Sequence, residues 1–289
     1  MKKRKIGIIG KGFVGGAVAH GFSSGVGYEC DLYINDKDPS KSSHSLEEVV
    51  NKSEFIFVSV PTPSNADGSI NLDIVNNLMA DIANINTPNQ PIILLRSTIV
   101  PGTTENIQSQ FPNLKIIFNP EFLTERSANF DFLSQTRYVL GGSNENTAKV
   151  ADLYRERFGS SISIIETNTQ TAELIKYVCN CFFATKVSFL NEMRSISDKV
   201  GANWDHVIEG FVRDGRVGHS HINVPGPDGK FGFGGSCFPK DVQAMINFFE
   251  KNNEEANVLK GVWERNLVAR PEKDWENLKG RAIVDSDSS

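Results

Sequence analysis

The stretch KIGIIGKGFVGGAV, residues 5–18, joins a short apolar run to a helical pattern through a glycine-rich turn. Gly10, Gly12 and Gly15 have the spacing G-x-G-x-x-G. Gly10 would permit a tight turn, Gly12 would let a pyrophosphate approach the backbone, and Gly15 would let the helix pack closely on a sheet. The N-terminus of that helix would direct N–H groups at a phosphate. The stretch therefore predicts a strand, a turn and a helix that bind a dinucleotide, with a tight turn that binds nothing as the alternative.

An acidic residue stands about 20 residues beyond the last glycine, as dinucleotide sites require. This residue, Asp36, directly follows the apolar run CDLYIN. Its carboxylate would accept hydrogen bonds from an adenosine ribose diol and would repel a 2′-phosphate. The pattern favours NAD over NADP, although Lys37 could offer a partner to a phosphate.

Residues 1–168 alternate short apolar runs with helical patterns. We expect strands at residues 5–10, 30–35, 54–60, 91–97, 114–119, 137–142 and 161–166, and helices at residues 13–22, 45–52, 71–85, 103–111 and 144–158. Nearly continuous apolar strands separated by helices indicate a parallel sheet covered on both faces. The fold class is therefore α/β, and residues 1–168 are expected to form a doubly wound, Rossmann-like NAD-binding domain.

The second part of the chain, residues 169–289, has helical patterns and no strand pattern. Residues 169–200 are one long helical stretch, apolar on most of its circumference, which is typical of a buried helix or a subunit interface. Further helices are expected at residues 204–212, 241–251 and 255–269. We therefore expect an all-helical catalytic and dimerisation domain that ends in a disordered tail, DSDSS.

Composition narrows the class of protein. The net charge is −5, which argues against a nucleic-acid partner, since phosphate contacts need clustered Lys and Arg. No run approaches the ~20 apolar residues of a membrane span, so no membrane partner is expected. The 4 cysteines have neither a disulfide framework nor the spacing of metal ligands. Reduced thiols, no metal and a cytoplasmic location are the expectations.

One cysteine stands out by its position in GFGGSCFPKD, residues 232–241. Pro239 suits the first turn of a helix, which places Cys237 just before a helix N-terminus, where a thiolate is favoured. Gly234 and Gly235 would let a substrate carbon approach the sulfur. This pattern predicts a nucleophile; a buried structural cysteine is the alternative.

The same stretch resembles the catalytic-cysteine signature of the UDP-glucose/GDP-mannose dehydrogenase family. Further segments resemble motifs of that family in the same order: GKGFVGG, VPTP, RSTIVPG, NPEFLTERSA and AELIKYVCNCFFATKVSFLNE. The resemblance extends to about residue 266. It implies that a nucleotide-sugar alcohol, expected to be that of UDP-glucose, is oxidised to the carboxylate of UDP-glucuronate for polysaccharide biosynthesis. Two NAD⁺ would be used, with an enzyme thioester midway.

The resemblance assigns the nucleophile to Cys237, whose thiolate would trap the aldehyde as a thiohemiacetal that can give up a second hydride. Lys176 would stabilise the developing oxyanion, and Asn180, one turn later on the same helix face, suits the same task. Lys176 also stands out without the resemblance, because a lysine facing a core is costly without a partner or a purpose. A lysine that snorkels at a helix edge is the alternative.

Three more catalytic residues follow from the same resemblance. Asp241 would orient or deprotonate a water or a hydroxyl, and Glu121 and Thr98 would hold the water used for hydrolysis. The alternatives are a strand-end carboxylate that caps the next turn for Glu121, and a turn-capping hydroxyl for Thr98.

The remaining expected contacts fall into two sets. The cofactor-binding residues are Gly10, Gly12, Phe13, Val14, Gly15, Asp36, Pro61, Thr62, Ser97, Thr98 and Glu125, of which Glu125 could touch the sugar instead. The substrate-binding residues are Glu121, Phe122, Leu123, Lys176, Asn180, Arg216, Phe231 and Gly234.

The resemblance also bears on assembly. It implies that Arg216, with Arg213 as the competing candidate, reaches the substrate of a neighbouring subunit, so that a homodimer forms through residues 170–200. Full-length members continue into a second Rossmann-like domain, and this chain is expected to be a short form that lacks it. Two other readings therefore stay open: a non-catalytic or partner-dependent NAD-binding homologue, and a single-step hydroxyacid dehydrogenase.

Overall fold

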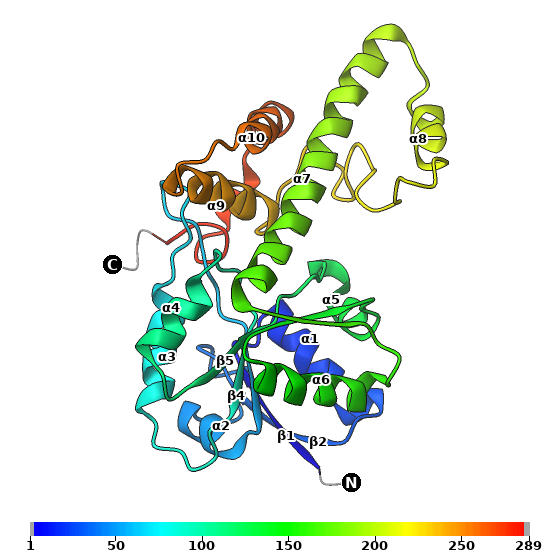
Figure 1. The fold of residues 1–289 in the computed structure, drawn as a ribbon. Helices are drawn as coiled ribbons and strands as arrows, with labels where there is room; N and C mark the ends of the chain where they lie inside the picture. The colour runs from blue at the N-terminus through cyan, green and yellow to red at the C-terminus, as the bar shows by residue number, and fades with distance from the viewer. Residues whose placement is uncertain (1–2, 286–289) are drawn as a thin grey trace. The chain divides into compact units, whose positions relative to one another are not determined.

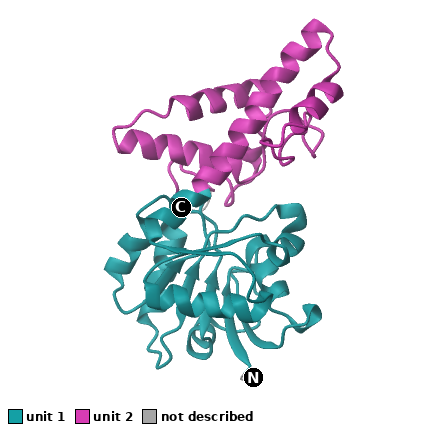
Figure 2. Cartoon of the chain, turned by 45° about the vertical axis from the view of Figure 1, so that its right-hand side comes forward, with its two compact units in different colours: residues 1–62, 72–176 teal, residues 63–71, 177–289 magenta. Residues whose placement is uncertain are grey.

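The computed structural model describes residues 3–285, and the chain divides into two compact units (Figures 1 and 2). Unit 1 comprises Met1–Thr62 and Leu72–Lys176, and unit 2 comprises Pro63–Asn71 and Tyr177–Ser289. Each unit is described by itself. Apart from Asp285, the expected disordered tail lies outside the described residues.

Unit 1 is built on a seven-stranded sheet in the order β2-β1-β3-β4-β5-β6-β7. The strands are β1 (Arg4–Ile9), β2 (Cys30–Asn35), β3 (Phe55–Val58), β4 (Ile92–Leu95), β5 (Lys115–Phe118), β6 (Tyr138–Gly141) and β7 (Ile164–Thr167). Neighbouring strands pair in parallel except β5 and β6, which are antiparallel. The expected α/β class with a Rossmann-like sheet is confirmed, and the antiparallel pair is a feature that the apolar pattern did not reveal.

Helices cover both faces of this sheet, as its doubly apolar strands require. One face carries α1 (Phe13–Gly21), α5 (Ala128–Leu133) and α6 (Asn144–Phe158). The other carries α2 (Leu46–Lys52), α3 (Asp73–Asn84), α4 (Thr103–Gln110) and the first turn of α7 (Thr169–Val200). Of these, α5 was not predicted, because its six residues, ANFDFL, are too few to show a helical period.

Side chains that cap the N-terminus account for where two of these helices begin. The Ser45 hydroxyl accepts from the Glu48 N–H, and the Glu48 carboxylate accepts from the Ser45 N–H, so a complete capping box starts α2 as the sequence predicts. At α4 the orphan N–H groups of Gly102 and Thr104 donate to Glu173 of α7, at 2.6 and 2.8 Å. A carboxylate remote in sequence therefore caps α4.

The strand order reverses between β1 and β3. In sheets of this kind ligands bind beside the carboxyl ends of the strands at such a point. The segments that follow β1, β3, β4 and β5 begin at this edge of the sheet, and each contains one of the predicted site motifs.

Unit 2 is mainly helical. It holds the rest of α7, together with α8 (Trp204–Val212), α9 (Phe238–Lys251) and α10 (Asn257–Ala269). Leu190, Trp204 and Val224 form a small buried cluster between α7, α8 and the loop that follows. Residues 63–71 join this unit because the Ser64 N–H donates to the Ala282 carbonyl, and Ser64 forms isolated bridges with Ile70 and Ile283. Among residues 3–285, no helix has both the length and the apolar character needed to cross a membrane.

Gly21 offers a test of packing in unit 1. A methyl group at this position would overlap the ring of the fully buried Phe132, whereas a methyl at Gly16 of the same helix meets nothing within 4 Å. We expect Gly21→Ala to lower the free energy of unfolding by about 1–3 kcal/mol, because the aromatic core must shift. Gly16→Ala, the matched control, should raise it by about 0.5–1 kcal/mol. Urea unfolding without NAD measures both, and equal midpoints for Gly21→Ala and wild type would contradict this packing.

Candidate active site

The glycine-rich turn follows β1. Gly10 has φ +85°, and a Cβ there would lie 2.7 Å from the Ser59 carbonyl oxygen, so β3 approaches the turn too closely for a side chain. A Cβ at Gly15 would overlap the Gly10 carbonyl, which is how α1 packs against the turn. Gly12 is different, because it is exposed and a Cβ there would meet nothing within 4 Å. The space beside Gly12, at the N-terminus of α1, is open to a phosphate. Phe13 and Val14 form the half-buried first turn of that helix.

Asp36 lies immediately after β2, where its carboxylate is half-buried. One oxygen accepts from the Lys11 N–H at 2.5 Å, and the other accepts from the Asp38 N–H at 2.8 Å. The carboxylate therefore braces the glycine-rich turn, and each oxygen keeps a lone pair for a ribose hydroxyl. The open space at Gly12 and this acceptor at the end of β2 fit a dinucleotide.

Hydroxyl groups connect the segments that follow β3 and β4. The Thr62 hydroxyl donates to the Thr98 carbonyl at 2.8 Å, and the Ser97 hydroxyl donates to the Val60 carbonyl at 2.7 Å. Thr62 and Ser97 are buried, Thr98 is half-buried and Pro61 is exposed. In unit 1 the two buried hydroxyls therefore join the segments that follow β3 and β4.

A buried ion pair lies where β5 ends. Glu121 is two residues beyond Asn119, and its carboxylate accepts from Lys176 Nζ at 2.7 Å, while the Glu121 carbonyl accepts from the same ammonium at 2.6 Å. Glu121 and Lys176 are 5% and 3% exposed. The second carboxylate oxygen accepts from the Leu123 N–H at 2.7 Å. Lys176 is thus a buried and paired lysine rather than one that snorkels at a helix edge.

The charge state of Glu121 follows from this environment. Burial by itself raises the pKa of the carboxyl, but the charge and hydrogen bond of Lys176, the Leu123 N–H and the charge of Arg96 together hold that pKa below its ordinary value. Glu121 is therefore ionised at neutral pH. A carboxylate with two cations around it can orient a water molecule or a hydroxyl that donates to it.

Three residues close to this pair, Arg96, Asn119 and Tyr154, were not among the predicted site residues. Arg96, 2% exposed, donates to Asn119 Oδ1 at 2.5 Å, and the Tyr154 hydroxyl donates to the same oxygen at 2.6 Å. The Asn119 amide donates to the Val139 carbonyl at 2.9 Å, so the turn that carries Glu121 is fixed to β6. The signal in the sequence was a charged residue, Arg96, directly after a buried strand.

Three neighbouring predicted residues have different surroundings. Leu123 is buried, and the half-buried Phe122 ring lies 5.7 Å from Lys176 Nζ and 4.1 Å from the Arg137 guanidinium. Glu125 is exposed in a short 3₁₀ turn. Phe122 is therefore the apolar surface beside the buried ion pair.

In unit 2, Cys237 is the N-cap residue of α9, with Pro239 in the first turn as predicted. The Cys237 carbonyl accepts from the Asp241 N–H at 2.9 Å, and the Ser236 hydroxyl lies 3.8 Å from the sulfur. The thiol is half-buried and belongs to no disulfide. Its place at a helix N-terminus is one that favours a thiolate.

Asp241, 1% exposed, lies one turn further along α9. One carboxylate oxygen accepts from the Asn180 amide at 2.6 Å, and the other accepts from Lys240 Nζ at 2.5 Å. Asn180 and Lys240 are themselves buried. The structure therefore joins two of the predicted residues, Asn180 and Asp241, in one hydrogen-bonded cluster whose third member, Lys240, was not among the predicted site residues.

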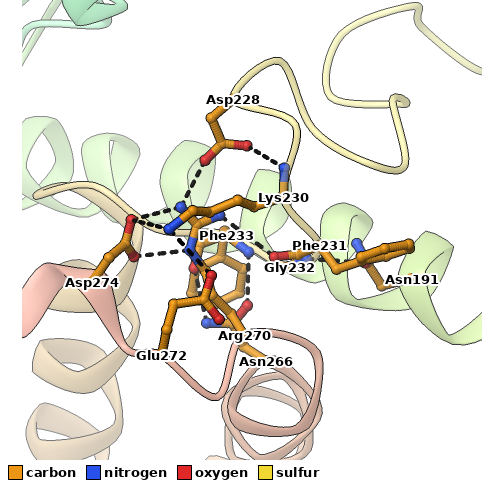
Figure 3. A network of polar contacts seen from close by, with 10 residues as sticks. All are labelled: Asn191, Asp228, Lys230, Phe231, Gly232, Phe233, Asn266, Arg270, Glu272 and Asp274. Atoms are coloured by element: carbon orange, nitrogen blue, oxygen red, sulfur yellow. Dashed lines mark hydrogen bonds and ion pairs between the residues drawn. The ribbon is translucent and has the colours of Figure 1, made fainter.

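The glycine-rich loop before Cys237 packs on Asn266 of α10 and on Arg270, the residue after that helix (Figure 3). A Cβ at Gly234 would lie 2.5 Å from Arg270 Nε, so this glycine makes room for a guanidinium of the same unit. The close approach of Arg270 is a second reason for a glycine at this position, and a substrate contact at Gly234 stays a prediction. Phe231 is 45% exposed.

The two arginines that follow α8, Arg213 and Arg216, do not differ in a way that selects one of them as the substrate-binding arginine. Arg216 pairs with Asp214 at 2.6 Å and Arg213 pairs with Glu209 at 2.8 Å. Both side chains are exposed. Residues 3–285 contain no group of three or more His, Cys, Asp and Glu side chains arranged to hold a metal ion.

Two models of one family match this chain. The model for the NAD-binding domain of the UDP-glucose/GDP-mannose dehydrogenase family matches residues 32–158, and the model for its central domain matches residues 170–267. Among individual sequences, a UDP-glucose 6-dehydrogenase of Rickettsia prowazekii is 37% identical over 221 residues, which are 74% of this chain and 49% of the relative. The chain thus spans about half the length of the curated relatives that it matches.

Solved structures give the same result. A UDP-glucose dehydrogenase from Pyrobaculum islandicum aligns with a TM-score of 0.81 and 27% identity, over 92% of this chain and 68% of that one. A GDP-mannose dehydrogenase from Pseudomonas aeruginosa aligns with a TM-score of 0.65 and 26% identity, over 95% of this chain and 71% of that one. The expected NAD cofactor agrees with the NAD-binding domain that the first model describes.

The ion pair at β5 predicts a pH-dependent effect of mutation. Lys176→Met leaves Glu121 buried without its main partner, which we expect to cost about 3–5 kcal/mol of unfolding free energy at pH 7. The double variant Glu121→Gln/Lys176→Met should lose less, because it buries no unpaired charge. Urea unfolding measures both.

The sign of the pH effect differs between wild type and variant. In wild type the lowered pKa of Glu121 makes a stabilising contribution that is lost only as the pH falls below about 4, the ordinary value. In Lys176→Met burial dominates and raises that pKa, so the destabilisation should be greatest at pH 7 and shrink toward pH 4. Equal losses at both pH values would contradict the pair.

The surroundings of the cysteines predict an order of reactivity. Burial raises the pKa of Cys30 to about 11 and also raises that of Cys181. At pH 7.5 such thiols are ionised in roughly one molecule per thousand or fewer. We expect iodoacetamide to label Cys237 well before Cys30 and Cys181, as measured by mass spectrometry of the peptides. Cys237→Ser should remove the fast site and leave the two slow ones unchanged. Early labelling of Cys30 or Cys181 would contradict these surroundings.

Proposed function

Since the chain belongs to the UDP-glucose/GDP-mannose dehydrogenase family, we propose that it oxidises the primary alcohol of a nucleotide sugar, UDP-glucose, to the carboxylate of UDP-glucuronate. The observation that carries the proposal is the half-buried thiol of Cys237 at the N-terminus of α9, one turn from the buried carboxylate of Asp241. A single-step hydroxyacid dehydrogenase has no use for such a thiol.

The cofactor side of the reaction belongs to unit 1. Gly10 would form the tight turn, and Gly12 would leave room for a phosphate of NAD⁺ at the N-terminus of α1. The Asp36 carboxylate, which follows β2, would accept a hydrogen bond from a ribose hydroxyl. When bound, NAD⁺ accepts a hydride. Over the whole reaction one alcohol, two NAD⁺ and one water give one carboxylate, two NADH and three protons.

The first half of the reaction converts the alcohol to an aldehyde. The hydroxyl proton leaves the oxygen to a base, and a hydride leaves the carbon that bears this hydroxyl. We assign the polarisation of the oxygen to Lys176 and Asn180, whose N–H groups would donate to it as negative charge develops. Support for Lys176 comes from its burial and its ammonium, which Glu121 holds in one position.

The second half needs the thiol. The Cys237 thiolate adds to the aldehyde carbon and forms a thiohemiacetal, which keeps the aldehyde from diffusing away. Loss of a second hydride gives a thioester, and water then attacks the thioester carbon and releases the carboxylate and the thiol. We assign the activation of that water to Glu121, which is ionised at neutral pH, assisted by Thr98, and the orientation of the reacting groups to Asp241.

Assembly and location are part of the same proposal. The part of α7 that lies in unit 2 exposes large apolar side chains at a spacing of four and seven residues: Val178, Phe182, Phe189, Ile196 and Val200. Such a stripe supports a homodimer through this helix. We also propose that Arg216 of one subunit reaches the substrate of the other, and that the protein works in the cytoplasm, where its 4 cysteines stay reduced.

The test is NADH production by the purified protein with UDP-glucose and a panel of other UDP- and GDP-sugars. We expect about two NADH per sugar oxidised, and we expect Cys237→Ser to lower turnover by about 10³-fold or more, since nucleophile removal abolishes the covalent route. One NADH per sugar, or a Cys237→Ser variant as active as wild type, would refute the thioester route. NAD binding with no turnover of any sugar would instead support a non-catalytic or partner-dependent homologue.

A further inference from the structure

A network of buried polar groups in unit 2 surrounds the loop that leads to Cys237 (Figure 3). Asn266 of α10, 0% exposed, accepts from the Phe233 N–H at 2.7 Å and donates to the Phe233 carbonyl at 3.0 Å. One side-chain amide therefore satisfies both backbone groups of a buried residue, as a neighbouring strand would. The backbone at Phe233 is held in both directions by a single side chain.

The residue before Phe233 is held from a second helix. The Gly232 N–H donates to Asn191 Oδ1 of α7 at 2.9 Å. Gly232 has φ +67°, and a Cβ there would lie 2.5 Å from Asn266 Oδ1. The backbone is thus pressed against the Asn266 amide, and only glycine fits between them.

Arg270, one turn after Asn266, holds the two ends of the same loop. Its guanidinium is 2% exposed, and Nη2 donates to Asp228 at 2.6 Å and to Asp274 at 2.7 Å, while Nε donates to Asp274 at 2.8 Å. Nη1 lies 3.4 Å from the Phe231 carbonyl, and Gly234 packs against the guanidinium plane. A buried arginine is tolerated because two carboxylates pair with it, Asp274 through a fork of two hydrogen bonds and Asp228 through one.

The segment Phe231–Gly234, which these side chains hold, lies close to the thiol along the chain. Gly234 is three residues before Cys237, and α9 begins at Phe238. Between them only Gly235 adopts the left-handed conformation, with φ +71°. Whatever fixes Phe231–Gly234 therefore limits where the sulfur can lie.

We infer that Asn266 and Arg270 are positioning residues, which set the place of the Cys237 sulfur at the N-terminus of α9 by holding the backbone of Phe231–Gly234. This inference rests on the proposed function, since the place of the thiol affects turnover only if Cys237 is the nucleophile. Arg270 and Asp274 lie beyond residue 267, where the match to the central domain of the family ends. A misplacement of a reacting group by about 1 Å can lower the rate by about 10²-fold. Fixing the backbone before Cys237 would therefore raise the rate of a reaction that uses the thiol.

The experiment compares Asn266→Leu, Arg270→Lys and wild type in the full chain, with Val268→Ala as the control. Leu fills about the same space as Asn but bonds to neither backbone group of Phe233. Lys keeps the charge of Arg270 but cannot bond to Asp274 in a fork while it also bonds to Asp228. Val268 is on the same helix and is 70% exposed, so its substitution should leave every readout as in wild type.

Three quantities are measured for each protein: the dissociation constant of NAD, the pH profile of Cys237 alkylation by iodoacetamide, and kcat and KM with UDP-glucose. We expect both variants to bind NAD within about twofold of wild type, because unit 1 is untouched. We expect kcat to fall by about 10- to 100-fold. The midpoint of the alkylation profile should move to higher pH, since the sulfur no longer lies at the helix N-terminus.

The outcomes separate this inference from the proposed function. If the substitutions only loosen the loop and expose the thiol, the plateau rate of Cys237 alkylation changes, while the midpoint of its pH profile stays that of wild type. If midpoint and kcat per folded molecule both match wild type, Asn266 and Arg270 are structural only and the inference is wrong. If wild type produces no NADH from any sugar, the proposed function fails, yet the midpoint still decides whether these residues position the thiol. If Asn266→Leu does not fold, Arg270→Lys decides alone.

Discussion

The buried pair of Lys176 and Glu121 is the interaction on which the carboxyl edge of the sheet in unit 1 depends. Neither charge could stay in the protein interior alone, because an unpaired buried ion costs several kcal/mol. Together they fix the end of β5 to α7, and the Glu121 carbonyl bonds to the same ammonium. Glu173, three residues earlier on α7, caps α4 through Gly102 and Thr104. One turn of one helix therefore holds two of the segments at the carboxyl edge of the sheet.

The same edge owes its shape to hydrogen bonds between segments that are distant in sequence. Thr62 and Ser97 tie the strand ends of β3 and β4 to each other, and Asn119 links β5 to Arg96, Tyr154 and β6. Most of these groups are buried, so their bonds are strong and their absence would be costly. A rigid edge of this kind is what a dinucleotide site at a topological switch point needs, because the ligand must find its donors already in place.

In unit 2, buried hydrogen bonds fix the backbone on both sides of the Cys237 thiol. A reactive thiol must be reachable, so it cannot be packed on all sides, yet its position must be fixed. The loop before Cys237 is accordingly anchored a few residues away from the thiol, by Asn266 of α10 and by Arg270 directly after that helix, while the sulfur itself stays half-buried. The cluster of Asn180, Lys240 and Asp241 fixes the first turn of α9 on the other side of the thiol.

The sequence by itself determined the strands, most of the helices, the glycine-rich turn and the placement of Cys237 at a helix N-terminus, because each depends on residues within one or two turns of chain. The bounds of α6 and α7 coincide with those predicted, since both have a long, uninterrupted apolar period. The structure alone decided that β6 runs against β5, that Glu173 caps α4, that Lys176 meets Glu121, and that Gly234 faces Arg270. Each of these joins segments far apart in the chain, and the burial that makes such contacts strong is a property of the packed fold, which no local pattern of residues records.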